Sequence, residues 1–538
     1  MKTKKISRSI SLKIARILTA LITVTIYFGC GSSREKNEMM DNRVMQLPVQ
    51  RELTPLDESS RNFNTEEYNA IQENEFKDAL HNPLSTFSID VDKASYSNVR
   101  RFLSQNQMPP KDAVRIEEMV NYFKYDYPQP KGENPFSVQT ELSQCPWNKE
   151  HKLLHIGIQG KSIDYEDIKP SNLVFLVDVS GSMDEPNKLP LVKSSLKMLV
   201  KSLNRNDRIA LVTYAGNAGL VLPSTSCNET ETIEQAIDNL NAGGSTAGGE
   251  GIVMAYKTAE ENLIKGGNNR VILATDGDFN VGVSSTSELV SLIEGKRKDN
   301  IYITICGFGT GNYKDGRMEQ ISDIGNGNYF YIDNIQEAKK VFVTEMRANL
   351  FTIAKDVKIQ IEFNPAHVSS YRLIGYEDRV LNKEDFNNDK KDAGELGAGH
   401  TVTALYEIVP FGQESNTPKV DKLKYPEADK IKESTLKNNE LMVLKLRYKP
   451  INSDESKLIE STVFDEPIAF NQASDNFRFA SSVAAFGMLL RQSAYINKFS
   501  YDEVIAMAKN ADSHDDEGYR SEFIKLAETA SLLSTERK

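Results

Sequence analysis

The chain has few of the residues from which disulfide-stabilised proteins and zinc enzymes are built. It contains only four cysteines, Cys30, Cys145, Cys227 and Cys306. Because the last three are far apart and odd in number, a disulfide framework is not expected. The six histidines form no HExxH pattern, which argues against a zinc hydrolase. The sequence also has no GxSxG elbow, so nothing indicates a serine hydrolase of the α/β class.

The chain also lacks an excess of positive charge. The sequence has 76 acidic against 65 basic residues and a formal net charge of -11. Beyond the N-terminal segment no stripe of Lys and Arg interrupts the chain, so a nucleic acid partner is not expected. A nucleotide is not expected either. GFGTGN at 307–312 is not the full dinucleotide fingerprint, and GGSTAGG at 243–249 lacks the lysine of a phosphate loop.

Apolar runs are short except near the N-terminus. Basic residues are frequent up to Arg16, and the apolar sequence ILTALITVTIYFG then leads to Cys30. This pattern predicts an export signal over 1–29, because a permanent transmembrane helix needs about 20 apolar residues. Cys30 and the following GSS resemble the cleavage box of bacterial lipoproteins. Lipidation there would anchor the exported chain to a bacterial membrane, such as the outer membrane, with the protein facing either the periplasm or the cell surface. Ordinary cleavage that leaves a free thiol is the alternative.

The rest of the chain has the composition of a soluble globular protein, with 39% hydrophobic and 26% charged residues and a mean hydropathy of -0.46. Its length predicts about three folded units. Residues 30–80 are polar and poor in aliphatic clusters, which predicts a flexible tether. Residues 81–130 show two helical patterns separated by Pro109 and Pro110, which predicts a small α-rich module.

Residues 171–350 alternate apolar strand-like runs with amphipathic helical segments. This alternation predicts an α/β fold with a doubly wound, mostly parallel sheet, and strands as apolar as LVFLVDV indicate burial on both faces. Residues 131–170 and 351–470 alternate in the manner of strands, whereas 471–538 are helical. We expect the two strand-rich flanks to pair into one β-sandwich, with the α/β domain inserted between them.

Oxygen-bearing side chains stand at the ends of these predicted elements. Asp178 closes the strand LVFLVD, and the turn that follows carries Ser180 and Ser182. Thr246 lies in GGSTAGG, and Asp276 ends RVILATD. Ligands of open α/β sheets bind beyond the carboxyl ends of the strands, so we expect these side chains to meet at one rim. A set of hard oxygen ligands without His or Cys selects Mg²⁺, or alternatively Mn²⁺ or Ca²⁺.

The charge of this ligand set indicates what the metal would do. Two carboxylates balance a divalent ion and the hydroxyls are neutral, so an octahedral site would keep one position for water or an incoming group. We therefore expect the metal to bind an Asp or Glu side chain of a partner protein or peptide. The structural alternative for DVSGS alone is a strand end followed by turn residues.

The same residues resemble the metal ion-dependent adhesion site of the von Willebrand factor type A domain. DVSGS matches its DxSxS element, Thr246 its middle threonine and Asp276 its final aspartate. The resemblance implies that Ser180, Ser182 and Thr246 coordinate directly, and that Asp178 and Asp276 do so directly or through water.

The order of the segments is similar to that of bacterial YfbK-type lipoproteins. It runs from the signal through a module around IDVDKASYSNVRRFL and the type A domain to a module containing EDFNNDKKDAGELGAGHTVTALYEI. That family implies a membrane-anchored binding protein. We expect a binding module and not an enzyme.

Two other functions stay open. In the first, the type A domain is a scaffold for assembling a cell-envelope complex, and the metal matters little. In the second, more remote, IDVDKAS supplies Asp90 as the nucleophile of a phosphotransfer enzyme. We favour a capping or turn role for Asp90 and Asp92, because the pattern lacks the parallel strands expected around such a loop.

The segment DFNNDKKDAGEL has only part of a calcium-binding pattern. Asp385, Asn387 and Asp389 match it, but Lys390 stands where a glycine is required and Leu396 where a glutamate is required. We therefore expect a solvated acidic turn.

Overall fold

The protein is described here from a computed structural model. The structure describes residues 66–89, 92–163, 169–215, 218–244, 248–277, 286–311, 313–413, 438–496, 498–511 and 515–535. The chain divides into two compact units, Met1–Arg61 and Asn62–Lys538, and all described residues belong to the second.

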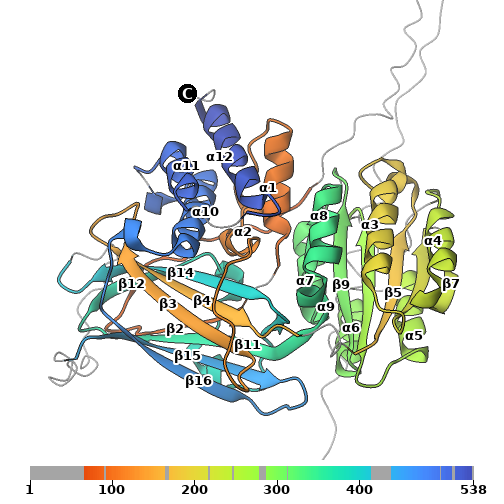
Figure 1. Cartoon of the computed structure of the whole chain (residues 1–538), viewed down its shortest axis with the longest axis horizontal. Helices are drawn as coiled ribbons and strands as arrows, with labels where there is room; N and C mark the ends of the chain where they lie inside the picture. The colour runs from red at the N-terminus through yellow and green to blue at the C-terminus, as the bar shows by residue number, and fades with distance from the viewer. Residues whose placement is uncertain are drawn as a thin grey trace, which may run out of the picture. The chain divides into compact units, whose positions relative to one another are not determined.

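The α/β domain is built on a mostly parallel sheet (Figure 1). Within the described residues its strand order is β10-β9-β8-β5-β6-β7. The bounds are Ser171–Asp178 for β5, Arg208–Tyr214 for β6, Ala218–Ser226 for β7, Asn268–Thr275 for β8, Ile301–Phe308 for β9 and Tyr329–Ile332 for β10. Only the edge strand β7 runs antiparallel to its neighbour among these described strands. The predicted doubly wound, mostly parallel sheet is thus confirmed.

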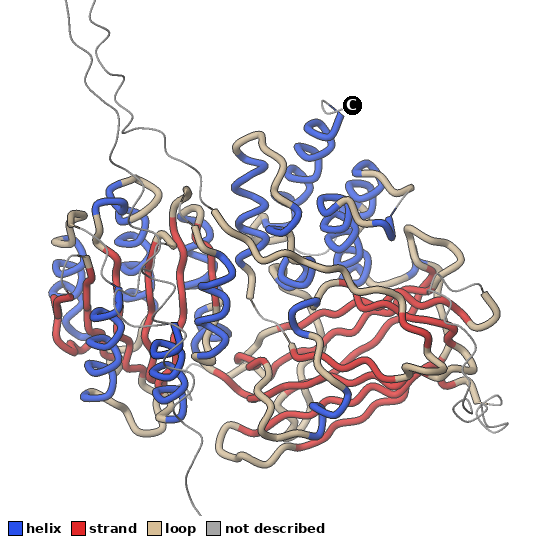
Figure 2. The backbone as a smooth tube through the Cα atoms, turned by 180° about the vertical axis from the view of Figure 1, so that it is seen from behind, coloured by secondary structure: helices blue, strands red, loops and turns tan. Residues whose placement is uncertain are grey.

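Helices cover both faces of this sheet (Figure 2). They are α3 (Leu189–Ser202), α4 (Thr230–Asp238), α5 (Gly248–Glu261), α6 (Thr286–Lys298), α7 (Asp315–Ile324), α8 (Ile335–Lys339), a π-helical turn (Lys340–Thr344) and α9 (Met346–Leu350). Successive residues of a strand point to opposite faces. Phe175 therefore packs in the core shared with α3 and α4, whereas Val174 and Leu176 pack in the core shared with α5. A strand buried on both faces needs the unbroken apolar run seen in LVFLV.

A β-sandwich contains strands from both sides of the α/β segment. One sheet has the order β1-β12-β14-β4-β3, and the other has β13-β11-β15-β16 with β2 on β11. The bounds are Lys77–Asp78 for β1, Leu84–Ser88 for β2, Phe136–Gln144 for β3, Lys152–Gly160 for β4, Thr352–Phe363 for β11, Val368–Ile374 for β12, Gly394–Gly397 for β13, Thr401–Pro410 for β14, Glu440–Pro450 for β15 and Lys457–Phe464 for β16. Strand β4 pairs antiparallel with β14, with His155 opposite Leu405. Apolar residues of the two sheets, such as Ile156 and Ile361, share one core. Strands that precede the α/β segment in the sequence therefore pair with strands that follow it, so the α/β segment is an insertion in the sandwich.

The N-terminal helices share a core with the C-terminal ones (Figure 1). They are α1 (Ala94–Ser104) and α2 (Ile116–Asn121), packed with α10 (Asp475–Arg491), α11 (Tyr501–Lys509) and α12 (Tyr519–Thr535). Phe123 contacts the rings of both Phe479 and Phe523. The structure thus differs from the predicted separate module over 81–130, because two helices this short need a partner layer to bury their apolar faces.

The predicted tether over 30–80 is too long at its C-terminal end. The carboxylate of Glu66 pairs with Arg101 at 2.8 Å, the backbone N–H of Glu67 donates to Tyr313 O at 3.0 Å, and β1 pairs with β12. These contacts could not be predicted from the polar composition of the segment, because they are made by charged side chains and the main chain and not by apolar clusters. Residues 30–65, the predicted signal 1–29 and Cys30 lie outside the described residues. In the described part of the chain, no helix has the length and apolar character needed to span a membrane.

Candidate metal centre

The turn DVSGS follows the central strand β5 at the edge of the sheet where the parallel strands end. Asp178 is fully buried at the end of β5. Its Oδ1 accepts the backbone N–H of Ser180 at 2.8 Å, which closes the turn. The hydroxyl oxygens of Ser180 and Ser182 then lie 3.0 Å apart. The turn thus places one carboxylate and two hydroxyls on a short stretch of chain.

Backbone hydrogen bonds hold this turn against the loop that leads to Thr246. The N–H of Gly243 donates to Val179 O at 2.7 Å, and the N–H of Gly181 donates to Gly244 O at 3.1 Å. The start of the predicted ligand loop is therefore fixed beside DVSGS. Thr246 itself lies outside the described residues, so its place in the site stays a prediction.

Asp276 reaches the same edge from the neighbouring strand. The parallel register pairs Val177 of β5 with Ala274 of β8, so the two strands end together. Asp276 is almost fully buried, and its charge helps raise the pKa of Asp178. The structure thus brings together the four predicted ligands that it describes.

The electrostatics of Asp178 show that its charge is poorly compensated. Burial raises the pKa of this carboxyl to about 6, and the charge of Asp276 acts in the same direction. Hydrogen bonds from Ser180 lower the pKa and offset part of this shift, and the nearby Tyr214 hydroxyl acts in the same direction. A cation between the two carboxylates would relieve the remaining cost of burying them.

The residues present fit a hard divalent cation. Among the described residues, Asp178 Oδ2 and Asp276 Oδ1 are buried oxygens without a hydrogen-bond partner, although the Tyr214 hydroxyl is near enough to Asp178 to influence its pKa. A buried carboxylate oxygen left without a partner is costly, and a metal ion is one partner that would satisfy it. The described part of the chain contains no group of three or more His, Cys, Asp or Glu side chains suited to a metal. Any metal held here would depend on the serine hydroxyls.

Lys188 is part of this site and was not found by sequence reasoning. Its ammonium donates to Ser182 O at 2.9 Å and to Asp276 Oδ2 at 3.2 Å. It therefore links the DVSGS turn to the neighbouring strand. One signal was present: Lys188 immediately precedes α3, at a position where Ser, Thr, Asp or Asn is usual and where the helix dipole disfavours a cation.

The other sequence candidates have structural roles where they are described. Asp92 Oδ1 accepts the N–H of Tyr329 at 2.8 Å and so ties the N-terminal region to β10. Asp90, the candidate nucleophile, lies outside the described residues. In the DFNNDKKDAGEL turn, the ammonium of Lys358 binds the carbonyls of Asp385 and Asn388 at 3.2 and 2.6 Å. A lysine thus binds the turn's backbone oxygens.

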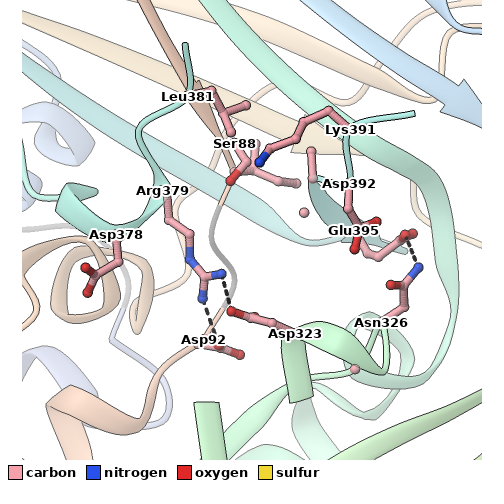
Figure 3. A pocket seen from close by; sticks show the side chains of 14 residues that line it. Ser88, Asp92, Asp323, Asn326, Asp378, Arg379, Leu381, Lys391, Asp392 and Glu395 are labelled. Carbon is pink, nitrogen blue, oxygen red and sulfur yellow. Dashed lines mark hydrogen bonds and ion pairs between the residues drawn. The ribbon is translucent and has the colours of Figure 1, made fainter. Parts of the chain in front are cut away.

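A polar pocket lies between α7 and the sandwich, away from the DVSGS turn (Figure 3). Arg379 spans it, binding Asp323 at 2.6 Å and Asp92 at 3.4 Å. Asn326 Nδ2 donates to Glu395 Oε1 at 2.9 Å on the other side. These pairs join segments that are far apart in the sequence, so we assign the polar side chains of this pocket a structural role.

Family models match most of the described chain. A model described as von Willebrand factor matches residues 62–155, the von Willebrand factor type A domain matches 172–344, and the C-terminal model of the uncharacterized protein YfbK matches 348–533.

Individual proteins resemble the chain to different extents. Uncharacterized protein YfbK of Escherichia coli strain K12 is 46% identical over 476 residues, which are 87% of this chain and 82% of that protein. The magnesium-chelatase 60 kDa subunit of Rhodobacter capsulatus is 32% identical over 116 residues, which are 21% of this chain and 20% of that protein. The solved structure of a von Willebrand factor type A protein from Catenulispora acidiphila is 15% identical. It covers 72% of this chain and 89% of its own, with a TM-score of 0.39. The chain belongs to the YfbK family and carries a von Willebrand factor type A domain over residues 172–344.

Proposed function

We propose that this protein is an exported, membrane-anchored binding protein whose type A domain holds Mg²⁺ and, through it, an Asp or Glu side chain of a partner protein or peptide. One observation carries the proposal. Asp178 Oδ2 and Asp276 Oδ1 are buried without a hydrogen-bond partner among the described residues, at the same edge as the paired hydroxyls of Ser180 and Ser182. Mn²⁺ and Ca²⁺ also suit this donor set.

Each residue of the site has a distinct part in this proposal. Asp178 and Asp276 supply the negative charge that holds the ion, and Ser180 and Ser182 supply neutral oxygens. Thr246 would add a further hydroxyl from its loop. A hard cation bound there accepts a carboxylate oxygen as an additional ligand. An acidic side chain is therefore the natural group for a partner to offer.

The anchor is the second part of the proposal. The export signal over 1–29 and lipidation of Cys30 would place the binding domain at a bacterial membrane, either in the periplasm or on the cell surface. The predicted tether would then join this lipid to the folded unit.

Metal titration tests the proposal directly. We expect the full chain to bind Mn²⁺ and Mg²⁺ in isothermal titration, and to capture peptides from an acidic library only when metal is present. Asp276→Ala should abolish both. Asp238→Ala is the matched control, because Asp238 is an exposed carboxylate on α4 that pairs with Lys197 away from the site. Metal binding that survives Asp276→Ala in a correctly folded variant would remove the proposal.

A scaffold for a cell-envelope complex is the second candidate. Lys188 already compensates Asp276 at 3.2 Å, so the rim has a cation of its own when no metal is bound. One relative, matched over 21% of this chain, is by its name a subunit of a larger enzyme. Pull-downs from membranes separate the two functions. Identical partner sets for the wild type and Asp276→Ala would favour the scaffold, whereas loss of partners would favour metal-dependent binding.

A further inference from the structure

Lys188 is a buried cation built into the candidate metal site. The residue is 4% exposed. Its ammonium donates to Ser182 O at 2.9 Å and to Asp276 Oδ2 at 3.2 Å. Glu185, a neighbour in the same turn, lies farther away at 3.8 Å and is half exposed. The ammonium therefore acts mainly on the carboxylate that also faces the proposed ion.

The fold makes room for this side chain. Gly309, just after β9, has φ of +73°, and a Cβ there would lie 2.6 Å from Cγ of Lys188. A larger residue at this position would collide with the lysine stem. The Gly309 carbonyl is in turn held by the Tyr331 hydroxyl at 2.7 Å. The path of the lysine is thus defined by packing and not by solvent.

Placing a cation here is energetically unfavourable on two counts. Lys188 occupies the N-cap position of α3 without a side-chain capping bond, at the end of the helix where the dipole disfavours positive charge. Burial also removes the ammonium from water. Among the described residues, the Asp276 carboxylate at 3.2 Å and the more distant Glu185 at 3.8 Å compensate for that loss. Because these two effects disfavour a lysine at position 188, we expect its charge to have a role in the site.

The formal charges indicate that role. Counted over the three buried charged side chains described here, Asp178, Asp276 and Lys188, the net charge is -1 without metal and +1 with a divalent ion. Without the lysine these values would be -2 and 0. The lysine therefore repels the incoming cation but leaves the loaded site positive. A positive, partly buried site attracts a carboxylate far more strongly than a neutral one does.

We infer that Lys188 is a positioning residue that sets the charge of the site, so that the metal binds more weakly and the partner carboxylate more tightly than they would without it. This inference rests on the proposed function. The competing view is that the ammonium replaces the metal altogether, in which case the wild type would bind no divalent ion.

The Mn²⁺ affinity and the acetate affinity of one variant, Lys188→Met, distinguish these views. Mn²⁺ is titrated into the full chain of the wild type and of Lys188→Met, and acetate is then titrated at saturating Mn²⁺ while water proton relaxivity is followed. We expect Lys188→Met to bind Mn²⁺ about tenfold more tightly and acetate about tenfold more weakly. A purely structural role would weaken both together. Lys197→Met is the control, since Lys197 lies on the same helix and pairs with Asp238.

Each outcome has a defined meaning. Opposite shifts of the two affinities support the inference. Unchanged affinities, or weaker binding of both ligands, overturn it and leave the proposed metal site standing. Mn²⁺ binding only by Lys188→Met, or by neither protein, overturns the proposed function as well. If Lys188→Met does not fold, Lys188→Gln is used, because an amide can still donate to the Ser182 carbonyl without carrying charge.

Discussion

The hydroxyl oxygen of Ser180 lies 3.0 Å from that of Ser182, on a turn closed by the buried Asp178. This spacing lets two neutral oxygens of one turn face a common ligand. It is a property of the local chain, because the N–H of Ser180 is bound to the carboxylate that ends the strand.

Removing either hydroxyl should weaken metal binding without unfolding the protein. We expect Ser180→Ala and Ser182→Ala each to lower Mn²⁺ affinity by about tenfold, since one oxygen ligand is lost while the backbone bond of the turn remains. Calorimetric titration measures this change. Ser194→Ala on α3 is the control, because that exposed hydroxyl donates to the Pro190 carbonyl of its own helix. Equal affinities for all three variants would show that the serines are not ligands.

The buried His155 predicts how stability depends on pH. Burial lowers its pKa from 6.5 to about 3, so the folded state keeps the ring neutral while the unfolded state protonates it. The neutral ring therefore contributes its full stabilisation above pH 6.5. As the pH falls from 6.5 toward 3, the free energy of unfolding decreases by about 1.4 kcal/mol per pH unit.

Urea unfolding at pH 7 and at pH 5 measures this slope. His155→Gln should flatten it, because glutamine does not titrate and can still bond the Tyr127 hydroxyl, which lies 2.9 Å from the ring. The variant keeps part of the slope, since burial also lowers the pKa of His400 to about 3. A variant as pH-sensitive as the wild type would contradict this account of His155.

The ion cluster around Arg100 should contribute strongly to stability. Its guanidinium binds Asp333 at 2.5 Å and Glu337 at 2.6 Å, and it joins α1 to α8 of the α/β domain. Arg100→Ala would leave the buried carboxylates of Asp333 and Glu337 without this guanidinium, which we expect to cost about 3 to 5 kcal/mol of unfolding free energy.

Thermal and urea unfolding test this expectation. Arg478→Ala is the control, because Arg478 pairs with Asp475 at a partly exposed position on α10 and should change stability by less than about 1 kcal/mol. If the two arginine variants are equally stable, the buried cluster does not hold these segments together.

The proposed lipid anchor makes a separate prediction. Cys30→Ser should release the exported protein from the membrane fraction, because the lipid would have no thiol to attach to. Fractionation of cells, with mass spectrometry of the mature N-terminus, measures this. A Cys145→Ser variant is the control, since that thiol is buried in the folded unit. Membrane retention of Cys30→Ser would exclude lipidation at this position as the anchor.

The α/β sheet could be predicted from the sequence because its strands are buried on both faces. A run such as LVFLV has no other common explanation when helical segments flank it, and Val174 and Phe175 indeed pack in different cores. The position of Asp178 and Asp276 at one edge follows from the same parallel order. The sandwich was predictable from alternation, whereas the end of the tether and the packing of residues 81–130 against the C-terminal helices were not.

Other features depend on contacts that no local pattern encodes. Glu66 looked like part of a tether because its partner, Arg101, is 35 residues away. Phe123 gave no sign that its ring would meet Phe523 near the C-terminus. Lys188 carried a weak local signal, a cation where a helix cap was expected, but its contact with Asp276 spans 88 residues. Long-range pairs of this kind become visible only once the strands are placed.

Anomalous diffraction from crystals grown with Mn²⁺ tests the central claim most directly. The account predicts one strong Mn²⁺ peak bounded by Asp178, Ser180, Ser182 and Asp276, with the Lys188 ammonium beside Asp276 and outside the coordination shell. The account is contradicted if crystals saturated with Mn²⁺ show no such peak at this edge of the sheet and the Lys188 ammonium lies between the two carboxylates instead.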